Sequence, residues 1–177
     1  KKIVINIFYL KNKIKKKLSN KFKTKIHYSE ERVLLNTGGG IKNAIKLLKV
    51  KEFFVINSDI IWEEKKKNPF DQLNKFWNKD KMDALLLLYP KKEKIGDYNI
   101  NKSNRIISNK NKPKYIFTGI QILKSKLFLK TKKKIFPLFL IYEQLIEKRR
   151  VFGLVYNGKW FHIGTLESLQ EYKKMLK

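Results

Sequence analysis

Two stretches of the sequence carry residue types that could do chemistry. Thr37-Gly38-Gly39-Gly40 precedes a run with helical apolar spacing, and Asp59 follows the apolar run 53–57. A glycine run lets the backbone approach a ligand closely, and the free N–H groups of a helix start suit an anion or a polar ring. In open α/β sheets, ligands bind beyond the carboxyl ends of the strands, where Asp59 would be a metal ligand. The spacing therefore predicts a nucleotide site.

The elements that would position these residues alternate along the chain. Apolar runs predict strands at 2–8, 53–57, 83–89, 115–123 and 151–156, and helical apolar spacing predicts helices at 10–18, 41–48, 69–77, 139–147 and 165–176. This alternation predicts an α/β fold with a mixed, mainly parallel sheet, in a single domain over residues 1–177. Asn157-Gly158 predicts a hairpin between 151–156 and a strand at 160–163. The polar stretch 91–113 predicts an insertion over the site.

The net charge of +27 is the strongest compositional signal. A chain this basic could bind nucleic acid or an anionic membrane surface. However, only four of the 42 basic residues are arginine, the residue that base readout and bidentate phosphate contacts favour. We therefore expect a solvated lysine surface with a general attraction for phosphate-bearing substrates, and we regard nucleic acid as an unlikely partner.

Composition also bounds the class of protein. Cysteine is absent, which excludes disulfides, zinc–thiolate sites and thiol catalysis and is compatible with the cytoplasm. No apolar run is long enough to span a bilayer, so we expect no membrane partner. With 177 residues, 42% of them hydrophobic, the chain can bury a core.

Five segments occur together in a recognisable order: LNTGGGIKNAI, FFVINSDIIW, KMDALLLL, YIFTGIQIL and GKWFHIGTLESL. In order and spacing they resemble the sugar-1-phosphate nucleotidyltransferases. The resemblance is strongest to the branch with N-acetylmuramate-1-phosphate uridylyltransferase and mannose-1-phosphate guanylyltransferase-like proteins. It implies a three-layer αβα Rossmann-like fold. It also implies a cytoplasmic transferase of nucleotide-sugar and cell-wall precursor synthesis.

The resemblance implies a reaction and a set of site residues. A nucleoside triphosphate (UTP or GTP) and a sugar 1-phosphate would give a nucleotide-sugar and pyrophosphate, with Mg²⁺ as cofactor. By resemblance, Asp59 is the catalytic metal ligand and His162 stands at a second metal position. The other implied contacts are Thr37, Gly38, Gly39, Gly40 and Asn57 to the nucleotide, and Gly96, Asp97 and Gly119 to the sugar.

Three departures from the family pattern bear on activity. The family's first strand and its Gly-rich, Arg-containing triphosphate loop are missing ahead of residue 1, so we expect the chain as given to be inactive. Relatives usually carry Asp where His162 stands, and imidazole is a poor Mg²⁺ ligand. Two alternatives follow. Either the ion is bound by one carboxylate and waters, or His162 contacts the phosphate or the sugar directly. Asn36 stands where relatives often have Glu.

Two other function classes stay open on the sequence. The first is a non-catalytic nucleotide- or sugar-binding remnant, which the missing triphosphate loop and His162 favour. The second is a basic nucleic-acid-binding α/β domain, which would bind its partner with a steep dependence on salt.

Overall fold

The computed structural model describes residues 2–19, 21–63, 68–90, 96–107 and 112–176. The chain divides into two compact units, one formed by residues 1–52 and 124–144, the other by residues 53–123 and 145–177. The single-domain organisation expected from the sequence stays a prediction. Parts of the expected insertion, 91–95 and 108–111, lie outside the described residues.

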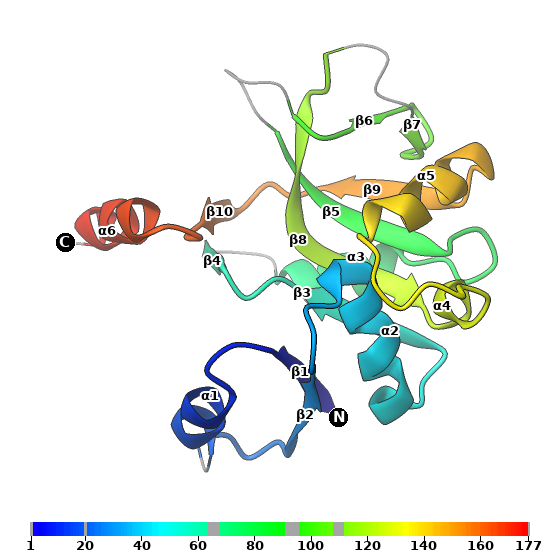
Figure 1. Cartoon of the computed structure of the whole chain (residues 1–177). Helices are drawn as coiled ribbons and strands as arrows, with labels where there is room; N and C mark the ends of the chain where they lie inside the picture. The colour runs from blue at the N-terminus through cyan, green and yellow to red at the C-terminus, as the bar shows by residue number, and fades with distance from the viewer. Residues whose placement is uncertain (1, 20, 64–67, 91–95, 108–111, 177) are drawn as a thin grey trace. The chain divides into compact units, whose positions relative to one another are not determined.

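The first unit is built on a pair of parallel strands. Its elements are β1 (Ile3–Ile7), α1 (Lys11–Leu18), β2 (Ile26–Glu30), α2 (Asn36–Leu48) and α4 (Lys126–Leu129). β1 pairs with β2, and α2 packs against both strands (Figure 1). The Lys15 ammonium donates a hydrogen bond from α1 to the Glu30 carboxylate and thereby lowers the pKa of Glu30.

The continuous apolar residues of the run at 2–8 predict a buried strand, but β1 is only partly buried. Ile7 is 2% exposed, but Ile3 is 42% exposed. The reason is that β1 has a single partner strand among the described residues, so part of its apolar surface stays accessible.

The second unit contains a four-stranded sheet in the order β3-β8-β5-β9. Its strands are β3 (Glu52–Ile56), β5 (Ala84–Pro90), β8 (Tyr115–Lys124) and β9 (Val151–Val155). β5 runs antiparallel to β8 and parallel to β9, so the sheet is mixed. The expected α/β class with a mixed sheet is confirmed. The ends of β3 and β8 and the helix α5 (Phe139–Glu147) cross the division between the units.

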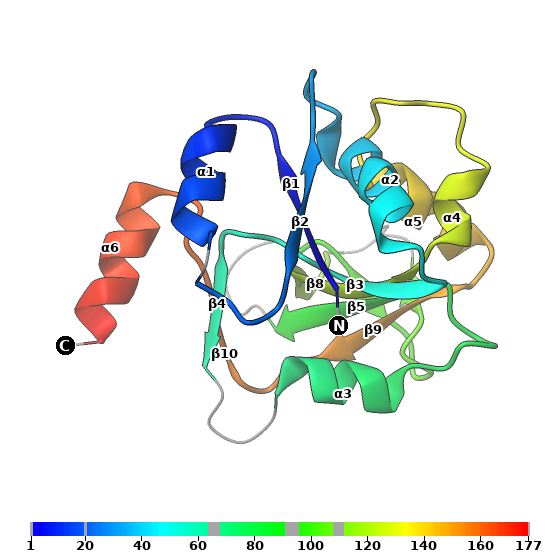
Figure 2. The same cartoon turned by 90° about the horizontal axis from the view of Figure 1, so that it is seen from below.

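The core of the second unit follows the apolar run that the sequence marks as a strand. Residues 84–88 of β5 are 0% exposed. Helix α3 (Pro69–Phe76) covers one side of this sheet and adds the fully buried Leu73 (Figure 2). α3 begins as the sequence predicts, because the Asn68 side chain accepts a hydrogen bond from the Phe70 N–H and Pro69 occupies the first turn.

The predicted hairpin at Asn157-Gly158 is wrong. β10 (Lys159–His162) does not pair with β9 but runs antiparallel to β4 (Ile60–Glu63), as Figure 2 shows. The glycine has a packing reason instead, since a Cβ on Gly158 would lie 2.3 Å from the ring of Tyr156. This pairing brings His162 beside Asp59.

Two smaller elements complete the second unit. The described part of the expected insertion forms a hairpin of β6 (Asn99–Ile100) and β7 (Ile106–Ile107). Helix α6 (Leu166–Met175) is capped by the Thr165 side chain, extends away from the sheet of its unit, and has no buried residue (Figure 1). Among the described residues, no helix has the length and apolar character needed to cross a membrane.

Candidate active site

Asp59 and His162 lie side by side although 103 residues separate them in sequence. The backbone N–H of Ile163 donates to the Asp59 carbonyl at 2.8 Å, which extends the pairing of β10 with β4 by one step. The side chains meet with His162 Nε2 3.1 Å from Asp59 Oδ2. Both remain accessible, with 44% of the Asp59 side chain and 56% of the His162 side chain exposed. The pair is therefore open to a ligand.

Gly164 leaves room beside this pair. A Cβ on Gly164 would lie 2.9 Å from His162 Nε2 and 3.2 Å from Asp59 Oδ2. Both distances are shorter than an ordinary contact, so a side chain here would push into the space that the two polar atoms face. Gly164 was not among the site residues that the sequence predicts. Its position two residues after His162 in the same motif is the signal that could have found it.

The Trp160 ring lies beside the ring of His162. Its ring is stacked on that of His162, with centroids 6.4 Å apart and planes at 23°. Its indole N–H donates to the Thr118 carbonyl at 2.9 Å, which fixes the ring that His162 rests on. The buried Thr118 hydroxyl in turn donates to the Leu87 carbonyl at 2.9 Å. The orientation of His162 is thus tied to the core strands β8 and β5.

Two features of the structure require glycine at position 119, and one of them is its contact with Asn57. Its φ is +85°, which residues with a side chain rarely adopt. A Cβ here would also lie 2.8 Å from the Cβ of Asn57. The Asn57 N–H donates to the Gly119 carbonyl at 2.9 Å, so these two predicted site residues form one contact. Asn57, Asp59, His162 and Gly119 are consequently linked within one unit.

Gly96 and Asp97 hold the edge of β8. The Asp97 carboxylate accepts a hydrogen bond from the Phe117 N–H at 2.8 Å, and the Asp97 N–H donates to the Tyr115 carbonyl at 2.7 Å. Gly96 lies so close to the same strand that a Cβ would be 2.5 Å from the Tyr115 oxygen. Both residues therefore have a structural role, and their contact with a sugar stays a prediction.

The glycine run lies in the first turns of α2, as the sequence predicts, but its N–H groups are not all free. The N–H groups of Gly38 and Gly39 both donate to the Phe136 carbonyl, at 3.0 and 3.1 Å. The Thr37 N–H donates to Asn36 Oδ1 at 2.7 Å, and the Thr37 hydroxyl accepts from the Leu138 N–H at 3.0 Å. The expectation that these N–H groups are free is therefore wrong: the Phe136 carbonyl, in the same unit, accepts from Gly38 and Gly39, and the Asn36 side chain accepts from Thr37.

The glycines themselves are required by close packing. A Cβ on Gly38 would lie 2.4 Å from the Phe136 ring, and one on Gly39 would lie 2.2 Å from the Lys134 carbonyl oxygen. On the far side, a Cβ on Gly40 would lie 2.9 Å from the carboxylate of the buried Glu31. A nucleotide role for residues 37–40 stays a prediction. These four residues belong to the first unit, whereas the other predicted site residues belong to the second.

The Asp59–His162 pair is a small donor set for a divalent ion. Among the described residues, no group of three or more His, Cys, Asp or Glu side chains could hold a metal ion. The Asp59–His162 pair supplies one carboxylate and one imidazole facing a space that lacks a side chain. Two protein ligands suffice for an ion that keeps waters and binds substrate phosphates, and this pair fits such an ion.

Comparison with known proteins decides the family. The family model described as nucleotidyl transferase matches residues 1–177, the whole of the chain. The chain belongs to the nucleotidyl transferase family. A relative within the family is the N-acetylmuramate alpha-1-phosphate uridylyltransferase of Caulobacter vibrioides, with 28% identity over 173 residues, 91% of this chain and 72% of the relative.

Solved structures agree on the nucleotidyltransferase fold. HddC from Yersinia pseudotuberculosis matches with a TM-score of 0.82 and 22% identity, over 99% of this chain and 79% of that chain. The inositol-1-phosphate CTP transferase from T. maritima matches with a TM-score of 0.74 and 16% identity, over 99% and 76%. The enzyme class expected from the sequence, sugar-1-phosphate nucleotidyltransferase, is confirmed.

Proposed function

We propose that this chain is part of an enzyme that transfers a nucleotidyl group from UTP or GTP to a sugar 1-phosphate, with a divalent ion held at Asp59. The inactivity expected of the 177 residues alone stays a prediction. The observation that carries the proposal is the half-exposed Asp59 carboxylate, which follows β3 in a chain that the family model matches throughout. A cytoplasmic location goes with the proposal, since nucleoside triphosphates are its substrates.

The proposed chemistry is an in-line displacement. An oxygen of the sugar 1-phosphate forms a bond to the α-phosphorus of the triphosphate, and the bond from that phosphorus to the bridging oxygen breaks. The electron pair leaves with pyrophosphate, and the product is a nucleotide-sugar. Such a reaction depends mainly on positioning and on neutralising phosphate charge. A bound divalent ion, Mg²⁺ by resemblance, would supply part of that neutralisation.

The residues of this chain take separate parts in the proposal. Asp59 holds the ion, and His162 faces the same space. In the second unit we assign the nucleotide to Asn57, whose exposed side chain supports contact with a ligand. In the first unit, the exposed Thr37 side chain supports the separate proposal that residues 37–40 contact a nucleotide. We assign the sugar to the β8 side, at Gly119 and at the Gly96-Asp97 turn.

The relatives suggest which substrates to try first. The relative in Caulobacter vibrioides is a uridylyltransferase for N-acetylmuramate α-1-phosphate. Among the solved structures, HddC is described in complex with GMP-PN and a UDP-glucose pyrophosphorylase in complex with UDP-glucose. UTP with N-acetylmuramate 1-phosphate is therefore the first pair, which would place the product among cell-wall precursors, and GTP is the second nucleotide.

The test measures binding and turnover separately, because the chain spans 72% of that relative's length. Calorimetry with UTP and GTP gives binding, and pyrophosphate release with each sugar 1-phosphate gives turnover. If the chain turns over substrate at all, we expect Asp59→Asn to lower that turnover about a hundredfold or more, because it removes the proposed metal ligand. Asp71→Asn, at an exposed aspartate in the first turn of α3, is the matched control and should leave turnover unchanged.

The outcomes separate the function classes. Nucleotide binding without turnover, even with added divalent ion, would favour a non-catalytic nucleotide-binding protein. If neither nucleotide binds, or if Asp59→Asn turns over substrate like the unaltered chain, the proposed transferase is wrong.

A further inference from the structure

The ion site proposed at Asp59 has an unusual second donor. Among the described residues, the group beside the Asp59 carboxylate is the His162 imidazole, with Nε2 3.1 Å from Oδ2. A carboxylate oxygen is a hard donor that suits Mg²⁺, whereas an imidazole nitrogen suits first-row transition ions. The identity of the second donor therefore bears on which ion the site prefers.

The distance between the two donor atoms fits shared coordination. Neighbouring ligands on an octahedral ion with bonds of about 2.1 Å lie about 3 Å apart. The observed 3.1 Å between Asp59 Oδ2 and His162 Nε2 is close to that separation. Both side chains are about half exposed, so an ion can replace the direct hydrogen bond between them.

Surrounding contacts keep the imidazole in position for an ion. The stacked Trp160 ring supports one side of His162, and the Trp160 N–H is itself held by the Thr118 carbonyl. At Gly164 the absence of a Cβ leaves open the space that both donor atoms border. A histidine whose surroundings restrict its rotamers loses less conformational freedom when it binds an ion, so this support favours coordination.

We propose that Asp59 and His162 together bind a divalent first-row transition ion, from Mn²⁺ to Zn²⁺, more tightly than Mg²⁺. The proposal rests on the proposed function, since it names the ion class for the same site. Affinity for nitrogen-containing sites rises from Mn²⁺ through Co²⁺, so the preference over Mg²⁺ should increase in that order. The remaining positions on the ion would be filled by water and by phosphate oxygens of the substrates.

The test measures binding of the metal alone to the 177-residue chain. Calorimetric titrations with Mg²⁺, Mn²⁺ and Co²⁺ give the preference, and proton NMR of the Co²⁺ form shows whether an imidazole is coordinated. We expect Co²⁺ to produce a strongly shifted imidazole resonance. His162→Asp should abolish this resonance and lower the ratio of Co²⁺ to Mg²⁺ affinity at least about tenfold, because it replaces nitrogen by oxygen.

Two further variants make the test specific. The sequence contains one other histidine, His27 in the first unit, and His27→Gln should keep the resonance and the preference. Gly164→Ala keeps both ligands but places a methyl group against them, so it should weaken Co²⁺ binding. A resonance that survives in the His162→Asp variant, or an equal preference in that variant and the unaltered chain, would overturn the proposal.

Failure of this inference is distinct from failure of the proposed function. Suppose that the chain binds UTP or GTP and turns over substrate, but that His162→Asp leaves the ratio of Co²⁺ to Mg²⁺ affinity unchanged. That result would contradict the ion preference alone. A chain that shows the imidazole resonance but neither binds nor converts nucleotides would retain the metal site and refute the transferase.

Discussion

Arg150 is placed where a lysine could not make the same contacts. Its guanidinium donates to both carboxylate oxygens of Asp83, at 3.1 and 3.2 Å, and to the Asp80 carbonyl at 2.7 Å. Asp83 is 7% exposed and stands directly before β5, so its charge needs a partner. The planar, forked guanidinium satisfies this geometry, whereas an ammonium group is a point charge. In a chain with four arginines among 42 basic residues, this one has a structural explanation.

We predict that Arg150→Lys lowers the free energy of unfolding by about 1–2 kcal/mol, because a fork of charge-assisted hydrogen bonds is replaced by a single contact. Urea denaturation measures the change. The neighbouring Arg149→Lys is the control, since Arg149 is exposed, and it should change stability by less than about 0.5 kcal/mol. Equal effects of the two substitutions would contradict the role given to the Arg150 fork.

The sequence predicts which single residues have a special role better than it predicts the residues that they contact. Asp59 was placed by one physical rule, that ligands bind beyond the ends of strands. Gly119 lies inside β8, and a glycine inside a strand often marks a close approach, but its neighbour Asn57 could not be known without the fold. The Asp97 hydrogen bond to Phe117 was equally out of reach, because it joins residues 20 positions apart.

At the scale of elements, the start of α2 is fastened by residues 131–138. Leu35 accepts a hydrogen bond from the Phe136 N–H, and the Phe136 carbonyl accepts from Gly38 and Gly39. Further along the helix, the Lys42 ammonium donates to the carbonyls of Thr131 and Lys133. The segment thus supplies partners for N–H groups that the first turn of a helix leaves unpaired. The glycine run permits this close packing of α2 against residues 131–138, which lie in the same unit.

We predict that Gly38→Ala lowers the free energy of unfolding by about 2–3 kcal/mol, because its methyl group would meet the buried Phe136 ring at 2.4 Å. Phe136→Leu should relieve part of this cost, so the two changes should couple by about 1 kcal/mol in a double-mutant cycle followed by thermal or urea denaturation.

Gly39→Ala is the matched control for that cycle. Its methyl group would meet the Lys134 carbonyl oxygen at 2.2 Å, which is backbone that a smaller side chain at position 136 cannot move. Phe136→Leu should therefore give no relief to Gly39→Ala. Relief of both glycine variants alike would mean that the clash is not with the ring.

The positions of helices and strands were largely predictable from residues that are close in sequence. The pairing of strands was not predictable in this way. The Asn68 cap with Pro69, the Thr165 cap and the apolar run of β5 act through neighbours in sequence, and each element forms where expected. Asn157-Gly158 carries an equally local hairpin signal, yet β10 pairs with β4, about 100 residues earlier. Pairing partners are chosen by the whole fold, so the contact between Asp59 and His162 followed from no local rule.

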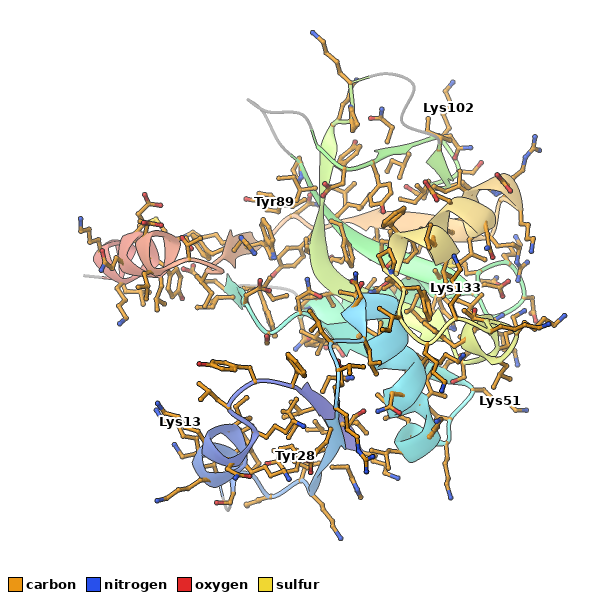
Figure 3. All side chains as sticks on the ribbon, in the orientation of Figure 1. Lys13, Tyr28, Lys51, Tyr89, Lys102 and Lys133 are labelled. Carbon is orange, nitrogen blue, oxygen red and sulfur yellow. The ribbon has the colours of Figure 1, made fainter. Side chains whose placement is uncertain are left out.

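At the scale of the whole molecule, the net charge of +27 is spread over both units. Figure 3 labels Lys13, Lys51, Lys102 and Lys133, which come from four separate segments and are all exposed. A surface of dispersed lysines raises the local concentration of phosphate-bearing ligands without selecting among them. Selectivity must then come from the site, which is why the charge alone does not identify the function.

This view of the charge can be tested against the nucleic-acid hypothesis. We expect a labelled DNA duplex to bind with a dissociation constant no tighter than about 1 μM at physiological salt, as for non-specific contacts, and binding to weaken steeply as salt rises. Fluorescence anisotropy over a salt series measures both quantities, with a duplex and a single strand compared. Nanomolar binding at physiological salt would require a dedicated basic surface. It would contradict the view that the dispersed surface lysines attract phosphate-bearing ligands without selecting among them.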